Sequence, residues 1–157
     1  MPARIVATLD STDAAYLAGL IDGEGSISLT RLHAGTNRQL LLTISSTEEA
    51  LVNWALSRIA AGKITRKRPV SPSHAPGLTY SIANRQALAV LQQVTPYLRS
   101  YKRQRAELVL ANYLALTPRN GRYSPDLRQA RIEFENEFAA MAVRGMRGIV
   151  GVAGPTG

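Results

Sequence analysis

Two stretches of alternating apolar and polar residues, each preceded by a helical pattern, restrict the folds open to this chain. The first covers residues 26–32 and 38–45 around a loop, and the second covers residues 63–68 and 78–83. Side chains with period two point to opposite faces of a strand, so each stretch predicts a β-hairpin with one buried and one polar face. Two hairpins joined by a helix predict an α+β domain, in which an antiparallel sheet carries helices on one face.

Helical patterns account for most of the remaining chain. One helix is predicted between the hairpins, starting at Ser46, which has capping-box spacing with Glu49. Others are predicted over residues 84–95 and 97–116 and from Ser124 onward. The segment from Arg144 is rich in glycine and is expected to be mobile. We therefore predict a single domain over residues 1–143 and a mobile C-terminal tail over residues 144–157.

The sheet face away from the helices is predicted to be open and polar, with basic residues along it. A two-stranded ribbon fits the major groove of DNA, where Gln, Arg and Lys reach base edges, so this face is a candidate DNA-binding surface. An ordinary solvated sheet face is the alternative. The basic residues 66–68 cannot all face one side, which leaves the orientation beyond Thr65 open. The candidate DNA-binding residues are Ser28, Thr30, Gln39, Thr43, Ser45, Lys63, Thr65, Arg66, Lys67, Arg68, Thr79 and Ser81.

Composition agrees with a nucleic-acid partner. The net charge is +8, from 19 Lys and Arg against 11 Asp and Glu, although a basic protein without such a partner is the alternative. The absence of cysteine excludes disulfides and thiolate chemistry, and two histidines far apart in sequence argue against a His-based metal site. Without a long apolar run or a signal peptide, the chain is expected to be intracellular and without a membrane partner. It would be cytoplasmic in a prokaryote, with an organelle as the alternative compartment.

Small residues recur along the apolar helical pattern that precedes the first hairpin. Leu17, Ala18 and Ile21 share one face of this helix, and Ala15 and Gly19 lie four residues apart beside them. Small residues at this spacing let another backbone approach closely. The pattern therefore predicts a helix that packs against another helix.

A carboxylate follows this helix between two glycines. Ser11 or Thr12 is expected to cap the helix start, while Gly23 and Gly25 end it. Glu24 would then lie just past the C-terminus, where unpaired carbonyls make the field negative. A carboxylate is unfavourable there unless a cation joins it, which points to a divalent metal ion.

Residues 17–25, with the sequence LAGLIDGEG, resemble the motif after which the LAGLIDADG homing endonucleases are named. The match is identical over residues 17–22, and Gly23 and Glu24 stand where the name has Ala and Asp. The similarity extends through Trp54, residues 96–98 and residues 124–126, and covers most of residues 13–143. Because the chain carries one copy of the motif, it resembles the single-motif, homodimeric subclass. The resemblance implies an αββαββα-like fold with a saddle-shaped antiparallel sheet.

The same resemblance implies a function in intron homing. Such a protein makes a metal-dependent, staggered double-strand cut with 3′ overhangs in a long, pseudo-palindromic DNA target. It works as a homodimer whose interface is formed by the motif helix, which implies contacts at Ala15, Ala18, Gly19 and Asp22. Asp22 is expected to act there as a hydrogen-bonding residue at the helix end rather than as a metal ligand.

The resemblance also assigns roles near the scissile phosphates. Glu24 through its carboxylate and Gly23 through its carbonyl would bind divalent metal, expected to be Mg²⁺ because the ligands are hard oxygens. Lys102 falls at the position of the active-site lysine, with a solvated charge as the alternative. Glu48 stands where relatives have a water-positioning glutamine. Val52 stands where relatives have an arginine, so Arg66, Arg103 or another residue substitutes for it, or cutting is slower.

Two other functions remain open from sequence. A relative that does not cut DNA, acting as an intron RNA maturase or a DNA-binding regulator, would keep the basic sheet face without needing Glu24. Retention of Glu24 argues against this alternative, while Val52 and Glu48 favour it. A basic structural or ribosome-associated RNA binder would present aromatic residues on the sheet for base stacking. Tyr80 is the only strand aromatic, and the alternation predicts that it points inward.

Overall fold

The computed structural model describes residues 4–31, 33–35, 37–68, 71–73 and 76–152, with the backbone alone described over residues 142–152. The chain forms two compact units, Met1–Arg99 and Ser100–Gly157. The first unit contains α1 (Ser11–Glu24), β1 (Gly25–Thr30), β2 (Gln39–Ser46), α2 (Glu49–Ile59), β3 (Lys63–Lys67), β4 (Gly77–Ala83), α3 (Asn84–Val94) and the 3-10 helix η1 (Thr95–Tyr97). The second contains α4 (Lys102–Asn112) and α5 (Pro125–Val152). The sequence predicts a single domain over residues 1–143. This range contains the whole first unit and residues 100–143 of the second.

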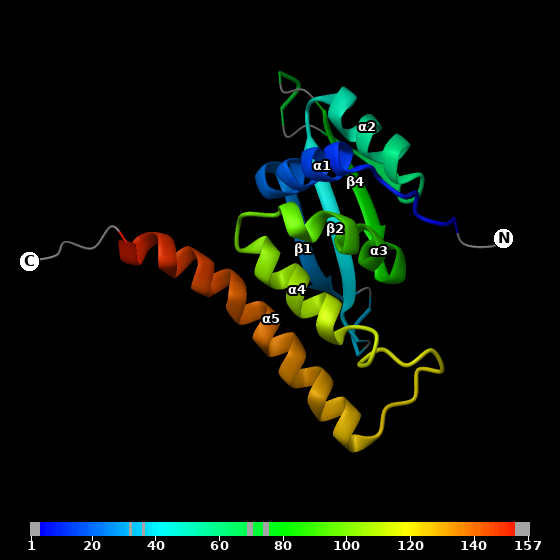
Figure 1. The fold of residues 1–157 in the computed structure, drawn as a ribbon, viewed down its shortest axis with the longest axis vertical. Helices are drawn as coiled ribbons and strands as arrows, with labels where there is room; N and C mark the ends of the chain where they lie inside the picture. The colour runs from blue at the N-terminus through cyan, green and yellow to red at the C-terminus, as the bar shows by residue number, and fades with distance from the viewer. Residues whose placement is uncertain (1–3, 32, 36, 69–70, 74–75, 153–157) are drawn as a thin grey trace, which may run out of the picture. The chain divides into compact units, whose positions relative to one another are not determined.

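The first unit is built on a four-stranded antiparallel sheet with strand order β1-β2-β4-β3 (Figure 1). One face of this sheet is apolar, and α1, α2 and α3 pack against it. The buried strand residues are Ile27, Leu29, Leu40, Leu42, Ile44, Leu78, Tyr80 and Ile82. Both hairpins and their inward residues are therefore confirmed, and the α+β fold class with them. Tyr80 points inward, as the alternation predicts.

Two glycines are required where helices meet strands in the first unit. A Cβ added at Gly25, between α1 and β1, would lie 2.7 Å from the Cα of Ile21. Gly62, between α2 and β3, has a φ of +99°, and a Cβ there would lie 2.7 Å from the Tyr80 hydroxyl oxygen. That hydroxyl donates a hydrogen bond of 2.7 Å to the carbonyl of Ala61. Close backbone approach thus fixes the path of the chain at both junctions.

The helix caps differ from the predicted ones. Asp10, rather than Ser11 or Thr12, caps α1, because its Oδ1 accepts the N–H of Asp13 at 2.7 Å. The capping box predicted from Ser46 is wrong. Its Oγ accepts the N–H of Glu48 at 3.0 Å, and α2 begins at Glu49 with no side-chain cap. Several neighbouring residue types can cap a helix, so backbone geometry rather than residue type decides between them.

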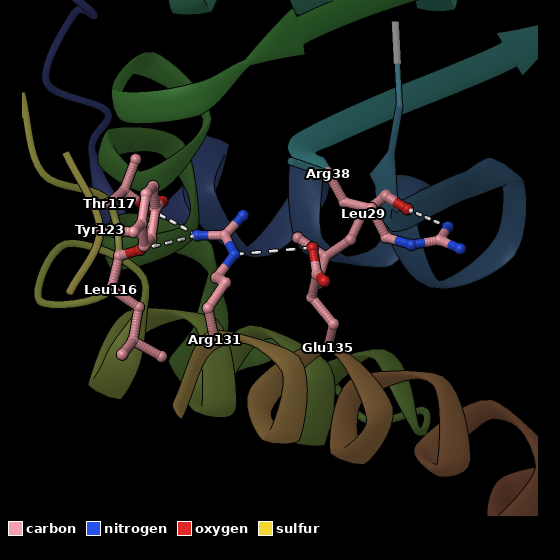
Figure 2. A network of polar contacts seen from close by, with 7 residues as sticks. All are labelled: Leu29, Arg38, Leu116, Thr117, Tyr123, Arg131 and Glu135. Atoms are coloured by element: carbon pink, nitrogen blue, oxygen red, sulfur yellow. Dashed lines mark hydrogen bonds and ion pairs between the residues drawn. The ribbon is translucent and has the colours of Figure 1, made fainter. Parts of the chain in front are cut away.

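In the second unit, the buried Arg131 of α5 forms hydrogen bonds with the segment that connects α4 to α5. Arg131 Nη1 donates to Thr117 Oγ1 at 2.7 Å and to the Leu116 carbonyl at 3.3 Å (Figure 2). Its Nε lies 3.6 Å from Glu135 Oε1, one turn along α5. Ser124 caps α5 as predicted, because its Oγ accepts the N–H of Leu127 at 3.1 Å.

The ends of the helical segments also differ from the predicted boundaries. The helix predicted over residues 97–116 is shorter, since α4 covers Lys102–Asn112. The backbone of α5 stays helical to Val152, so the tail predicted from Arg144 begins inside a helix. Residues 153–157 of that tail lie outside the described residues. Across the described chain, no helix has both the length and the apolar character needed to cross a membrane.

Candidate functional site

Strand pairing places most of the candidate DNA-binding residues in cross-strand rows on the outer face, the sheet face opposite α1, α2 and α3. One row joins Ser26, Thr43, Ser81 and Lys63 across all four strands. A second row joins Ser45, Thr79 and Thr65, and the hydroxyl oxygens of Ser45 and Thr79 lie 2.8 Å apart. Ser28 and Thr30 on β1 share this face with Gln39 on β2. All of these side chains are exposed or half-buried, so the four strands present a largely polar surface, interrupted by Leu41 and Ala83 in the row of Ser28.

The basic strand β3 divides its charges between the two faces. Lys63, Thr65 and Lys67 alternate onto the outer face. Arg66 instead pairs with the buried Leu78, and its Nη2 lies 3.5 Å from Glu49 Oε1 of α2. The expectation that Arg66 lies on the outer face with the other candidates is therefore wrong, because strand alternation turns it toward the helices. Arg68 is exposed beyond the end of β3.

A hollow of about 490 Å³ lies on the outer face where β4 leads into α3. Among the candidate residues, Thr30, Gln39, Lys63 and Ser81 line it. The lining also includes residues that the sequence pattern does not single out, namely Arg4, Leu41, Gly62, Ile82, Ala83 and Gln86. Arg4 precedes α1 outside any helix or strand, so hydrophobic periodicity carries no signal for it.

Glu24 is the last residue of α1 rather than the first residue beyond it. The helix closes with the Gly25 N–H bonded to the carbonyl of Ile21, and the side chain of Glu24 is exposed. Within the described residues, no hydrogen bond or ion pair occupies the Glu24 carboxylate. The last carbonyls of a helix, that of Gly23 among them, have no intrahelical donor. A free carboxylate and a free carbonyl thus lie next to each other at the end of α1.

These two oxygen ligands suit a hard divalent cation, since carboxylate and carbonyl oxygens are the ligands of Mg²⁺ and Ca²⁺. Over the described part of the chain, no group of three or more His, Cys, Asp or Glu residues could hold a metal ion. A metal ion at Glu24 would therefore not be held by a cluster of such side chains within the described residues.

Asp22 has a structural contact at the end of α1. Its Oδ2 accepts the N–H of Arg99 at 2.9 Å, which ties α1 to the segment after η1. This bond agrees with the expectation of a hydrogen-bonding residue at the helix end, while the place of Asp22 in a dimer interface stays a prediction.

Of the four residues predicted for the dimer interface, two lie on an exposed small-residue stripe of α1. Ala15 and Gly19 are exposed, and so is Gly23, four residues further along. A Cβ added at Gly19 or Gly23 would have no atom within 4 Å. Ala18 is fully buried in its own chain, so its assignment to an interface is wrong.

Glu48, Val52 and Lys102 are the other positions about which the resemblance makes a statement. Glu48 is exposed at the start of α2, and Val52 one turn later is fully buried in the core. The Val52 side chain faces the core, so this position supplies no charge to the surface. Lys102 is the first residue of α4 in the second unit and is only 9% exposed. The catalytic roles of Glu48 and Lys102 stay predictions from the resemblance.

Helices on one face of a four-stranded antiparallel sheet, entered through a motif helix that ends in a carboxylate, make up the fold of the LAGLIDADG homing endonucleases. The chain has this fold, as the resemblance predicts. It is similar to homing endonuclease I-CvuI in complex with its target, with a TM-score of 0.68 and 18% identity over 83% of this chain and 82% of that one. No protein-family model matches the chain, and no curated protein matches its sequence.

Two further solved structures have the same fold. The archaeal intron-encoded homing endonuclease I-Vdi141I, complexed with DNA, matches with a TM-score of 0.55 and 12% identity over 83% of this chain and 84% of that one. The I-SmaMI LAGLIDADG homing endonuclease, bound to cleaved DNA, matches with a TM-score of 0.54 and 15% identity. That match covers 86% of this chain and 46% of I-SmaMI, so the chain spans about half the length of I-SmaMI.

Proposed function

We propose that this chain is one subunit of a homodimeric, Mg²⁺-dependent homing endonuclease that cuts both strands of a long, pseudo-palindromic DNA target. The observation that carries this proposal is the exposed Glu24 carboxylate, which has no partner among the described residues. It ends the motif helix of a fold that solved homing endonucleases use in complexes with DNA. Residues 1–143 would act as the single endonuclease domain.

The outer face supports DNA binding. Its rows of hydroxyl and amide side chains can reach base edges, and Lys63 and Lys67 add cations at its β3 edge. A net charge of +8 favours a polyanion. I-CvuI, I-Vdi141I and I-SmaMI are each seen in complex with DNA.

The small-residue stripe of α1 supports a homodimer. Ala15, Gly19 and Gly23 lie one turn apart and would let two copies of α1 approach closely across a two-fold axis. Such an axis would bring the Glu24 carboxylates of the two subunits near each other. Two outer faces side by side would follow the duplex for about two helical turns, which predicts a pseudo-palindromic target.

The donor set at the end of α1 supports a divalent metal cofactor. The carboxylate of Glu24 and the carbonyl of Gly23 would hold the ion together with groups from the partner and the DNA. The bound metal would supply Lewis acidity and lower the pKa of a bound water. Lys102 would offset negative charge at the phosphate, and Glu48 would orient water. I-CvuI has been crystallised with its target in the presence of 2 mM Ca, and with another target in the presence of 2 mM Mg, where the DNA was not cleaved.

Replacing the Glu24 carboxylate with an amide tests this function. We predict that Glu24→Gln abolishes DNA cleavage in Mg²⁺, because the amide removes the charged metal ligand. DNA binding should remain largely intact, since the outer face is unchanged. Nicking of supercoiled plasmid and gel-shift affinity measure the two properties. Cleavage by the Glu24→Gln protein in Mg²⁺ would show that the metal assignment is wrong.

A DNA-binding or maturase function without cutting is favoured by one observation. Val52 is buried in the core, so the position at which relatives have an arginine supplies no charge to the site. This alternative predicts target binding without cleavage in Mg²⁺ or Mn²⁺ by the wild-type protein. Cleavage that depends on Glu24 would reject it.

A further inference from the structure

The segment before α1 is held in place by glutamine side chains of α3. Gln93 makes two bonds to it, accepting the N–H of Leu9 at 2.7 Å and donating to the carbonyl of Ala7 at 3.1 Å. Gln86, two turns earlier on α3, donates to the carbonyl of Arg4 at 2.7 Å. The N–H of Ala7 also donates to the carbonyl of Ile59 at 2.9 Å. Four hydrogen bonds therefore fix a stretch of backbone that belongs to no helix or strand.

Apolar burial orders this segment only in part, because Val6, Ala7 and Leu9 are half-buried. Ile5 is 89% exposed, and none of residues 4–9 belongs to the buried core. Ordering backbone costs about 1–2 kcal/mol of conformational entropy per residue, which the hydrogen bonds have to offset. These bonds hold the backbone of Arg4 in one position.

That place is the hollow on the outer face. Arg4 and Gln86 line it together with Lys63 of β3 and the polar residues Thr30 and Gln39. The lining thus contains two cationic side chains and no carboxylate. Arg4 forms no ion pair with any described residue, and it is exposed. A hollow with two unneutralised cations on a DNA-binding face favours an anionic group of the DNA.

We propose that Arg4 contacts a backbone phosphate of duplex DNA lying on the outer face, and that Gln93 and Gln86 position it there. The inference rests on the proposed DNA-binding function and adds a contact from outside the sheet. A guanidinium suits this role because its planar fork of donors matches phosphate oxygens. Gln93 does not line the hollow, so its proposed effect on DNA binding acts through the segment that it holds.

The first test compares two arginine variants of the full chain. Binding to a mixed-sequence duplex of about two helical turns is measured over a range of salt concentrations. Arg4→Ala should weaken binding and reduce the slope of log affinity against log salt by about 0.9, the contribution of one phosphate contact. Arg58→Ala removes the same charge from α2, where Arg58 pairs with Asp13 at 3.5 Å, and should leave the slope unchanged.

The outcomes of this test separate the inference from the function on which it rests. If the wild-type protein binds the duplex and Arg4→Ala has the wild-type slope, the inference is wrong and the proposed function stands. If the wild-type protein shows no salt-dependent binding to DNA, both are wrong.

The second test concerns the positioning role of Gln93. Gln93→Ala should reproduce part of the Arg4→Ala loss of affinity, and the double variant should bind no more weakly than Arg4→Ala alone. Gln92→Ala, which alters an exposed neighbour on α3, is the matched control and should bind like the wild type. If Gln93→Ala acted only by destabilising the protein, its loss of DNA affinity would add to the loss caused by Arg4→Ala. Additive losses in the double variant would overturn the positioning role.

Discussion

Glu24 and Gly25 are neighbours at the junction of α1 and β1. Different physical reasons explain why each residue type stands there. Gly25 is required by the fold, because any Cβ there would overlap the backbone of Ile21. Glu24 is not required by the fold, since its side chain is exposed and makes no bond within the described residues. A negative charge at a helix C-terminus is electrostatically unfavourable. The carboxylate therefore fits a functional role better than a structural one.

At Tyr80, the structure predicts an effect of pH on the stability of the folded state. Burial raises the pKa of Tyr80 above its ordinary value of 10.0, so the folded state retains the hydroxyl proton after the unfolded chain releases it. The stability that this group contributes is present below pH 10.0 and is lost as pH rises further.

Replacing Tyr80 with phenylalanine should lower the free energy of unfolding by about 1–3 kcal/mol at neutral pH. The reason is that the buried carbonyl of Ala61 loses its hydrogen-bond donor. The difference from wild type should shrink above pH 10.0. Urea unfolding of both proteins at about pH 7 and about pH 11 measures it. A difference that stays constant or widens with pH would contradict the assignment.

At the scale of elements, the sequence predicts the strands and their buried face. It does not predict which way the basic residues of β3 point. Period-two alternation in β1, β2 and β4 identifies the buried face, because apolar residues recur at every second position of each strand. In β3, Arg66 and Lys67 carry the same charge and face opposite sides, so pairing with β4 and an ion pair to Glu49 decide the orientation. Arg4 carried no periodic signal, because side-chain bonds from α3 place it.

The alternation along β3 predicts different roles for neighbouring basic residues. Lys63→Ala and Lys67→Ala should each weaken DNA binding and lower the slope of log affinity against log salt by about 0.9. Arg66→Ala removes the same charge from the opposite face and should leave the slope unchanged. Titrations of duplex DNA at several salt concentrations measure all three variants. Equal slopes for the lysine variants and the wild type would remove β3 from the DNA-binding face.

The exposed stripe on α1 predicts an effect on assembly. Gly19→Leu places a bulky side chain on that stripe and should convert a dimer into a monomer. A Cβ at Gly19 meets nothing within 4 Å in its own chain, so folding should be unaffected. Ala50→Leu makes a similar enlargement at an exposed position of α2 and should remain dimeric. Light scattering after size-exclusion chromatography measures the mass, and a dimeric Gly19→Leu protein would contradict the assigned interface.

For the whole molecule, the proposed double-strand cut would need two copies of the chain. It supplies one Glu24, one Gly23 carbonyl and one sheet with an open polar face. It also covers 46% of the length of I-SmaMI, which shares its fold. Two copies related by a two-fold axis would supply a carboxylate for each strand and a surface for each half of the target. Charge and fold together therefore favour a symmetric DNA-cutting dimer.

One measurement tests this account most directly. The purified protein is incubated with a randomised library of DNA duplexes in Mg²⁺, and the ends of cleaved molecules are sequenced. The account predicts cut molecules with 3′ overhangs, centred on a pseudo-palindromic sequence, and no cut molecules when Mg²⁺ is chelated or when Glu24→Gln replaces the wild type. Wild-type protein that binds members of the library but yields no Glu24-dependent cut ends would contradict it.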